Sequence, residues 1–367
     1  MDRFHRQTIL PDFGDAARER LASAHAMIIG CGALGCPAAD LLCRAGVGRL
    51  SIVDRDVVEL TNLQRQTLFD ERDAAEAAPK AEAAARRLRT VHAGARIDAI
   101  VEDFAGPDAE RIVSPNPAPG VLLDCTDNFE TRYLVNDVSV KLGIPYVYAG
   151  AVGTAGMVMC VIPGRSACLR CVFPDPPAPG TAPTCDTAGI LGPVAAMIGA
   201  RQSIEAIKFL IGRADLALQG VWSIDPWHNT GRHIGAPRAG ALDAERPAPG
   251  GRRADCPCCA QRRFEFLDAR GPEGEGARVL CGRNSVQVAP ARRSGSKDRP
   301  EALDLAALES RLARSGTFTR GTHHLRGRLT AESRPLELTV FSDGRAIIGG
   351  TIDPVEARAV YARYVGC

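Results

Sequence analysis

The sequence predicts an α/β fold whose mainly parallel sheet continues into antiparallel strands, followed by a small α+β domain at the C-terminal end. Apolar runs alternate with helical stretches over the first part of the chain, the pattern of a parallel sheet with helical crossovers. Residues 146–149 and 156–162 follow each other too closely for a helix, so we expect an antiparallel extension there. Residues 236–255, rich in proline, glycine, alanine and arginine, indicate a linker.

The elements of the first domain, residues 1–265, follow in order. We expect strands at residues 26–30, 49–54, 97–101 and 121–124, and helices at 33–45, 79–92, 131–142 and 191–212. Gly46 closes the first helix, and Pro79 opens the second at the position where its missing N–H costs least. Residues 175–184 contain too many prolines for regular structure and are expected to form a loop.

A second hinge at residues 270–276 precedes the small domain, residues 277–367. We expect strands near Val279, Val286 and Leu325 and at residues 336–341, with a helix at residues 303–314. Asp343-Gly344 is typical of a hairpin turn, and Asp353 precedes a proline as a helix cap does. Because this domain has no metal or nucleophile pattern of its own, we expect it to bind a protein partner. The alternative is an appendage that only extends the packing.

Composition restricts the function classes. The chain has 367 residues, 45% hydrophobic and 24% charged, which fits a soluble globular protein. A net charge of +2 gives no reason to expect nucleic acid or an anionic membrane as partner. The N-terminus lacks the apolar core of a signal peptide. The longest uncharged stretch in the helical region, residues 187–200, is short and contains glycines and Pro193, so we expect no membrane span. We therefore expect a cytoplasmic protein.

A glycine motif marks a nucleotide site. Gly30, Gly32 and Gly35 follow a strand and open a helix, where backbone N–H groups and the helix dipole bind phosphate. Asp54 ends the next strand, 24 residues after Gly30, where a carboxylate can accept hydrogen bonds from ribose hydroxyls. The alternative is that the glycines serve only strand–helix packing.

Further polar residues favour ATP over a dinucleotide. Lys80 falls in the first turn of a helix, where the dipole disfavours a cation unless it faces an anion. Asn62 and Arg65 lie in the polar run N-L-Q-R-Q, and with Lys80 they could offset charge on a departing diphosphate. Asp127 lies just beyond a strand end, where a carboxylate suits Mg²⁺. The alternatives are solvated surface for the cations and a helix cap for Asp127.

Twelve of the thirteen cysteines stand in contexts that indicate a role. Cys168-x-x-Cys171 and Cys256-x-x-Cys259 match the plan of a closed structural zinc site, with Cys258 spare. Cys185, at the end of the proline-rich loop and before a helix start, is either a nucleophile or a bystander. Cys281 is expected in a hairpin turn. The remaining thiols in apolar elements are expected to fill the core: Cys31, Cys36, Cys43, Cys125 and Cys160.

The order of these motifs resembles the ThiF/MoeB/HesA family of the ubiquitin-activating-enzyme superfamily over about residues 1–265. The matching segments are R-Q-T-I-L (6–10), G-C-G-A-L-G-C (30–36), A-G-V-G (45–48), D-x-D (54–56), N-L-Q-R-Q-T-L (62–68), P-K (79–80), D-C-T-D-N (124–128), C-L-R-C (168–171), T-C-D-T-A-G (184–189) and C-P-C-C (256–259). The resemblance implies a Rossmann-like fold and ATP-dependent adenylation of the C-terminal glycine of a small ubiquitin-like sulfur carrier, similar to ThiS or MoaD.

The resemblance also implies roles for single residues. Arg65 and Lys80 would act at the triphosphate, Asp127 at Mg²⁺ and Asp54 at the ribose. Arg6 would reach the phosphates of the other subunit in a homodimer, and a separate donor would supply the sulfur. Two other classes stay open: a nicotinamide-dependent oxidoreductase, and a non-catalytic binding protein of the same fold.

Overall fold

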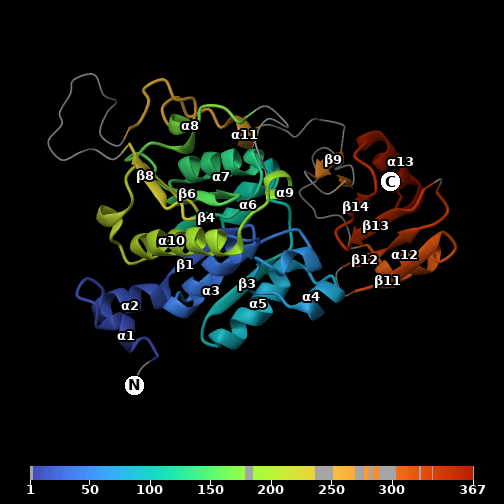
Figure 1. The fold of residues 1–367 in the computed structure, drawn as a ribbon, viewed down its shortest axis with the longest axis horizontal. Helices are drawn as coiled ribbons and strands as arrows, with labels where there is room; N and C mark the ends of the chain where they lie inside the picture. Colours follow the sequence, from blue (N-terminus) through green and yellow to red (C-terminus); the bar gives the residue numbers. More distant parts are fainter. Residues whose placement is uncertain are drawn as a thin grey trace. The chain divides into compact units, whose positions relative to one another are not determined.

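The computed structural model describes residues 3–177, 185–235, 251–268, 277–280, 284–288, 303–321, 324–332 and 334–366. The chain divides into two compact units, residues 1–270 and 271–367, and each is described by itself (Figure 1). Among the helices in the described ranges, none combines the length and apolarity needed to cross a bilayer.

An eight-stranded sheet forms the centre of the first unit, in the order β3-β2-β1-β4-β5-β6-β7-β8. β1 to β5 pair in parallel, and β6, β7 and β8 are added antiparallel, which confirms the predicted fold class. The last two strands were not predicted; every residue of β8 is exposed, and its sequence shows no apolar alternation. The strands are β1 (His25–Ile29), β2 (Arg49–Val53), β3 (Arg96–Ile100), β4 (Val121–Asp124), β5 (Tyr146–Val152), β6 (Ala155–Val161), β7 (Val221–Asp225) and β8 (Thr230–Ile234).

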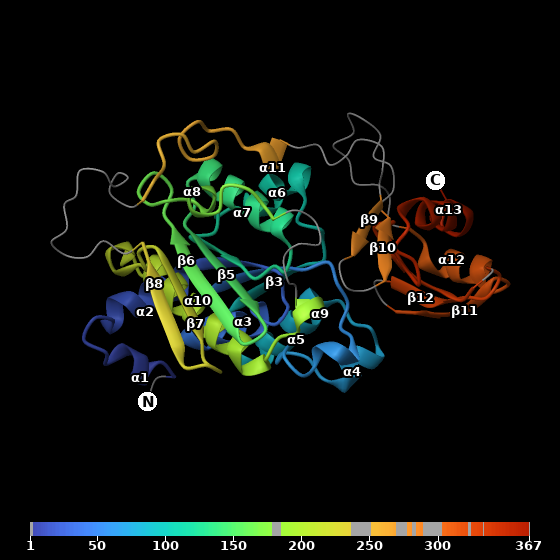
Figure 2. The same ribbon diagram turned by 45° about the horizontal axis from the view of Figure 1, so that its top comes forward.

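Helices cover both faces of this sheet, as Figure 2 shows. One face packs against α3 (Gly35–Ala45), α5 (Lys80–Val91) and α10 (Gly192–Leu210), and the other against α6 (Gly106–Val113) and α7 (Phe129–Leu142). A separate apolar core fills each interface. The shorter helices are α1 (His5–Thr8), α2 (Gly14–Ser23), η1 (Leu60–Asn62), α4 (Glu71–Ala75), α8 (Leu169–Val172), α9 (Cys185–Ala188), η2 (Ala214–Leu216) and α11 (Glu265–Asp268).

Two helix starts differ from the sequence prediction. Pro79 is the N-cap of α5 rather than its first residue, with an extended ψ of 129°. α7 begins at Phe129, two residues earlier than predicted, because the Asn128 side chain accepts a hydrogen bond from the Thr131 N–H at 2.8 Å. Gly46 ends α3 in the left-handed region as predicted.

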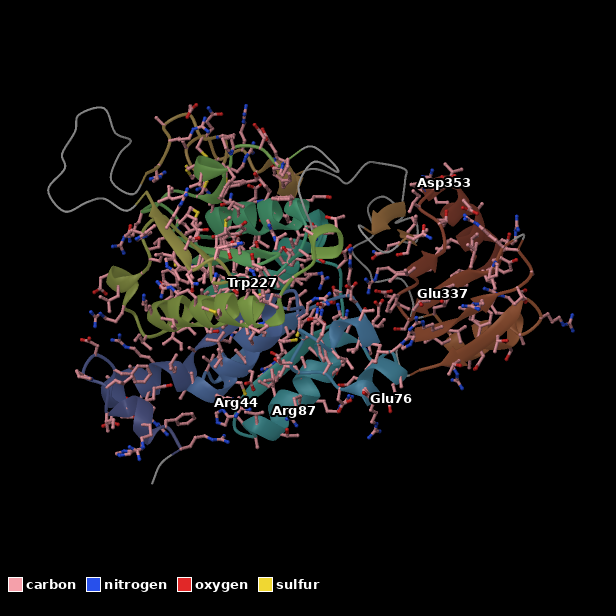
Figure 3. All side chains as sticks on the ribbon, viewed as in Figure 1. Arg44, Glu76, Arg87, Trp227, Glu337 and Asp353 are labelled. Carbon is pink, nitrogen blue, oxygen red and sulfur yellow. The ribbon has the colours of Figure 1, made fainter. Side chains whose placement is uncertain are left out.

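The second unit is a six-stranded antiparallel sheet in the order β11-β12-β13-β14-β10-β9, with two helices. Its turn at Asp343-Gly344 joins β13 to β14, and Asp353, labelled in Figure 3, caps the last helix, both as predicted. Cys281 lies outside the described residues. The elements are β9 (Ala277–Leu280), β10 (Ser285–Val288), α12 (Leu305–Leu312), β11 (Gly316–Arg320), β12 (His324–Leu329), β13 (Leu336–Phe341), β14 (Ala346–Gly349) and α13 (Pro354–Tyr364).

Candidate nucleotide site and cysteine cluster

The predicted nucleotide residues meet at one edge of the sheet. β1 lies between β2 and β4, so the connections diverge at its carboxyl end, the place where open α/β sheets bind ligands. Gly30 follows β1 with φ +91°, and a Cβ there would lie 2.7 Å from the carbonyl oxygen of Cys125, beyond β4. A Cβ on Gly35 would lie 2.0 Å from the Gly30 carbonyl oxygen. Both positions therefore require glycine for close backbone packing. This requirement exists in addition to any role in binding phosphate.

Asp54 joins the glycine loop to the loop after β2. Its carboxylate accepts hydrogen bonds from the Cys31 N–H and from the Asp56 N–H, both at 2.7 Å. Burial raises the pKa of Asp54, and the ammonium of Lys80 opposes that rise. The carboxylate stands where a ribose ligand is predicted, and it also holds the backbone of the phosphate loop in place.

Lys80 is buried, which excludes the solvated-surface alternative for this residue. It begins α5, and its Nζ lies 3.3 Å from a carboxylate oxygen of Asp56. Asn62 is also buried, and its Oδ1 accepts a hydrogen bond from the Glu59 N–H. Arg65 is only half-buried and donates to the carbonyl oxygen of Thr61 at 2.8 Å, so it is the more accessible cation of the two.

Asp127 is exposed in the loop between β4 and α7. The cap of α7 is Asn128, so the alternative of Asp127 as that cap is wrong. Asp124, in contrast, is fully buried: its oxygens accept from Thr126 and from the Tyr146 hydroxyl. The carboxylate that can face a ligand is therefore Asp127.

Two polar residues at this edge were missed from the sequence. Gln66 is buried with its Oε1 unpartnered among the described residues, and its Nε2 faces Gly32. Its place in the run N-L-Q-R-Q was a usable signal. Arg132 is also buried, on the first turns of α7, and no local pattern distinguishes it from a surface arginine of a helix.

Arg6 lies away from this edge of its own chain. It is exposed on α1, and the neighbouring Gln7 donates from Nε2 to the carbonyl oxygen of Ala45, at the C-terminal end of α3. The glycine loop adjoins the opposite end of α3, at Gly35, about 15 Å along the helix axis. Arg6 is thus not part of the nucleotide site formed by this chain alone.

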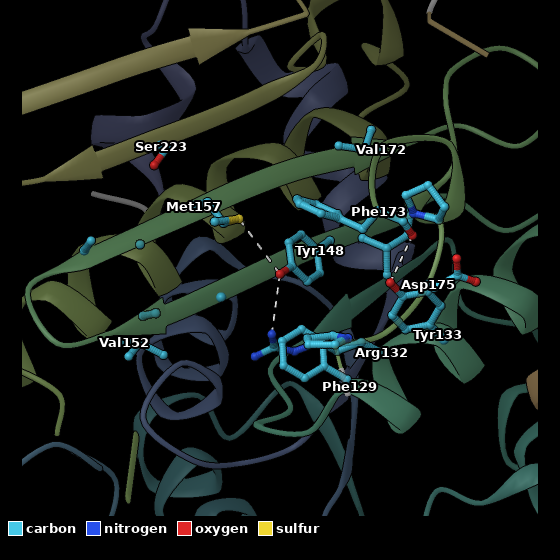
Figure 4. Close-up of a pocket in the computed structure, with 17 residues that line it drawn as sticks. Phe129, Arg132, Tyr133, Tyr148, Val152, Met157, Val172, Phe173, Asp175 and Ser223 are labelled. Carbon is cyan, nitrogen blue, oxygen red and sulfur yellow. Dashed lines mark hydrogen bonds between the residues drawn. The ribbon is translucent and has the colours of Figure 1, made fainter. Parts of the chain in front are cut away.

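An apolar cavity of about 530 Å³ adjoins the Asp127 loop (Figure 4). Its walls come from the start of α7, the strands β5 and β6, helix α8 and the segment 173–177. Aromatic and aliphatic side chains dominate, with Arg132 and Asp175 as the charged members; the apolar lining includes Phe129, Tyr133, Tyr148, Met157, Val172 and Phe173.

Four cysteines form a compact cluster beside α7. The Sγ atoms of Cys168, Cys171, Cys256 and Cys259 all lie within 4.8 Å of one another. The closest pairs, Cys171 with Cys259 and Cys168 with Cys256, are 3.4 Å and 3.6 Å apart. Tetrahedral Zn–S bonds place sulfurs about 3.8 Å apart, so the cluster is compatible with zinc. Cys258 is outside the set, as predicted.

Helix α7 holds both halves of this cluster. Asn136 accepts from the Leu169 N–H at 2.8 Å and donates to the Cys258 Sγ at 3.3 Å. Asp137, fully buried, accepts from the Phe266 N–H at 2.9 Å, and burial raises its pKa to about 6. These two neighbours in sequence thus fix the two distant cysteine segments to one helix.

The remaining thiols follow the prediction where they are described. Five are buried in the apolar cores, which confirms their assignment as core residues: Cys31, Cys36, Cys43, Cys125 and Cys160. Cys185 begins α9, but its side chain and residues 178–184 lie outside the described part, so its role as a nucleophile stays a prediction.

Several known proteins are similar to this chain. The chain is 37% identical over 365 residues to the sulfur carrier protein ThiS adenylyltransferase of Bacillus subtilis (strain 168), covering 99% of each protein. It is 40% identical over 217 residues to the sulfur carrier protein adenylyltransferase of Thermus thermophilus, covering 58% of this chain and 78% of the relative. For adenylyltransferase and sulfurtransferase MOCS3 of Sus scrofa the identity is 36% over 304 residues, 82% of this chain and 63% of the relative.

Solved structures share the fold. The crystal structure of E. coli MccB aligns with a TM-score of 0.57 at 22% identity, over 70% of this chain and 72% of that one. Residues 4–242 match the ThiF family. With more than half of its length in that match and a relative 37% identical along nearly all of it, the chain belongs to the ThiF family.

Proposed function

We propose that the protein adenylates the C-terminal glycine of a small ubiquitin-like sulfur carrier, using ATP. A carboxylate oxygen of the carrier attacks the α-phosphorus, the bond to the β-phosphate oxygen breaks, and diphosphate leaves. The relatives from Bacillus and Thermus, both sulfur carrier protein adenylyltransferases, support this reaction. The observation that carries the proposal is the buried Lys80 at the amino end of α5, beside the Asp54 loop that braces the glycine turn.

The residues of the edge have separate tasks in this proposal. Gly30, Gly32, Gly35 and Asn62 receive the phosphates, and Asp54 holds the ribose. Lys80 and Arg65 offset the negative charge that grows on the departing diphosphate. Attack at the α-phosphorus depends on in-line placement and charge neutralisation and needs no strong base.

Two metals belong to the proposal. Mg²⁺ would be held by Asp127, the exposed carboxylate at the sheet edge, together with phosphate oxygens, and would supply charge neutralisation during transfer. Zinc would be held by the four clustered cysteines, which fill a tetrahedral site and leave no open position for catalysis. Because those thiolates must stay reduced, we place the protein in the cytoplasm.

A homodimer completes the site in this proposal. Arg6 lies too far from its own glycine loop, and apolar side chains stand exposed beside it and on α10: Ile9, Leu10, Met197 and Ile204. A second copy of the chain covering this surface would bring its own Arg6 toward the phosphates. A separate sulfur donor would then displace AMP from the carrier, directly or through Cys185.

The C-terminal unit, residues 277–367, is proposed to dock the carrier or a downstream acceptor. The match to the Thermus relative covers only 58% of this chain, whereas the Bacillus relative aligns along nearly all of it. Because the family match covers residues 4–242, we assign adenylation to residues 1–265, and recognition is our proposal for the second unit.

The test is carrier-dependent ATP–diphosphate exchange by the purified protein. We expect exchange only when a ubiquitin-like protein ending in Gly-Gly is present. A nicotinamide-dependent oxidoreductase would instead bind NAD and show no exchange, and a non-catalytic binding protein would bind the carrier without releasing diphosphate. Either result would replace this proposal.

A further inference from the structure

One wall of the apolar cavity contains a buried arginine that forms no ion pair with a carboxylate of the described residues. Arg132 is 9% exposed, and its guanidinium lies 5.1 Å from the Phe129 ring centre and 5.6 Å from that of Tyr148 (Figure 4). Its hydrogen-bond partners among the described residues are the Thr126 carbonyl oxygen at 3.0 Å and the Tyr148 hydroxyl at 3.5 Å. The Nε donor has no partner there.

Such a donor is costly to leave unpaired. Removing an N–H group of a cation from water without a replacement acceptor destabilises the folded protein. The buried carboxylate of Asp124 is not the acceptor for this N–H, because its oxygens accept hydrogen bonds from Thr126 and Tyr146. The cavity therefore presents a positive, incompletely satisfied group in an otherwise apolar lining.

The space in front of this group is kept open by a glycine. Gly150 belongs to β5 and lines the cavity. A Cβ at this position would lie 3.1 Å from the Tyr148 hydroxyl oxygen and 3.6 Å from the NH1 of Arg132. An alanine would thus fill the corner that the guanidinium faces.

Resting on the proposed function, we propose that Arg132 receives the C-terminal carboxylate of the carrier and positions it for attack. The occupant must be narrow, compatible with an apolar lining, and end in an oxygen anion, which describes a glycine-terminated peptide tail. Arg132 contacts Thr126, next to Asp127, so a carboxylate bound there lies beside the proposed Mg²⁺ ligand. One carboxylate oxygen is held by the guanidinium, and the other is left to attack the α-phosphorus.

The experiment compares two forms of one probe. A ubiquitin-like carrier ending in Gly-Gly is prepared with a free C-terminal carboxylate and with a C-terminal amide, and binding is measured by calorimetry without nucleotide. For the wild type we expect the carboxylate form to bind about tenfold more tightly, since hydrogen bonds to charged groups are the stronger ones. Arg132→Met should reduce this ratio to about one. Arg49→Met, which removes a half-buried arginine at the amino end of β2, should keep the wild-type ratio.

Gly150→Ala is a second, independent test of the same proposal. It leaves Arg132 in place and fills the space in the cavity that the guanidinium faces. Loss of the ratio in this variant supports the proposal even if Arg132→Met fails to fold. A ratio that persists in both variants, or a wild type that binds the two forms equally, overturns the role of Arg132. If the wild type still exchanges ATP and diphosphate with that carrier, the proposed function stands. If it neither binds nor exchanges, the proposed function fails as well.

Discussion

The nucleotide edge and the cysteine cluster make opposite use of polar side chains. At the edge, Asp127 is exposed and Gln66 and Arg132 keep buried polar atoms without partners in the described chain. In the cluster, the thiols lie against one another and Asn136 pairs with both cysteine segments. Unpartnered groups beside an exposed carboxylate suit a ligand that comes from solution, whereas four thiols packed against one another suit a structural metal that stabilises the fold.

One helix links the two regions. Asn128 caps α7 beside Asp127. About 13 Å further along the helix, Asn136 and Asp137 accept hydrogen bonds from the two segments that carry the cysteines. We therefore expect changes at the edge to affect activity and changes at the cluster to affect stability.

The largest effect is expected at Asp127. Asp127→Ala should lower carrier-dependent ATP–diphosphate exchange by about 10²–10³-fold, because it removes a ligand of the ion that offsets phosphate charge. The melting temperature should not change, since the side chain is exposed and does not cap α7. Asp15→Ala, another exposed aspartate, is the control. Near-normal exchange in Asp127→Ala would remove the metal role from this residue.

Changes at the cysteine cluster should lower stability and leave the exchange activity in place. Cys171→Ser should abolish stoichiometric zinc and lower stability by roughly 4 kcal/mol, a shift of roughly 10 °C in the melting temperature. Exchange measured below that temperature should remain. Cys258→Ser, which changes the neighbouring thiol outside the cluster, should keep its zinc. Elemental analysis that finds no zinc in freshly reduced wild type would refute the assignment.

A third polar site, at the amino end of β1, should affect the pH dependence of stability. His25 is buried against Ser51 and Pro117, and burial lowers its pKa to about 4. A depressed pKa stabilises the fold above pH 6.5, and this contribution is lost as the pH falls toward 4. Urea unfolding should therefore lose roughly 3 kcal/mol from pH 7 to pH 4 through this group. His25→Gln should reduce the dependence of the free energy of unfolding on pH between pH 7 and pH 4. An unchanged pH dependence would contradict the lowered pKa of His25.

We also expect each nucleotide site to contain residues of both subunits of a homodimer. Arg6→Ala should impair exchange, and mixing it with Asp127→Ala should restore roughly a quarter of the wild-type activity, because half of the dimers are mixed and each holds one intact site. Absence of recovery despite proven heterodimers would place Arg6 outside the partner's site.

The smallest effect concerns the second unit. Truncation after Arg270, at the division between the two compact units, should preserve exchange at saturating carrier and weaken carrier or acceptor binding several-fold. If the truncated chain binds every candidate partner as tightly as the full chain does, the unit only extends the packing.

Local patterns predicted the parallel sheet, the glycine loop and the paired cysteines, because each is encoded by neighbours in sequence. β8 was missed because all five of its residues are exposed, and Asn128 was missed as the cap of α7 because Asp127 competes for that position. Arg132 and Asn136 acquire their roles only from long-range packing, against β5 and against Leu169 and Cys258. No spacing rule in one sequence reveals such contacts.

The most direct test of the account follows the fate of ATP. The protein is incubated with Mg²⁺, a Gly-Gly carrier and ATP labelled in the α-phosphate, and the carrier and released anions are separated. The account predicts that the label joins the carrier through its C-terminal glycine, that one diphosphate is released per carrier, and that Asp127→Ala forms neither product. Release of phosphate with an unlabelled carrier would contradict adenylation as the reaction of this site.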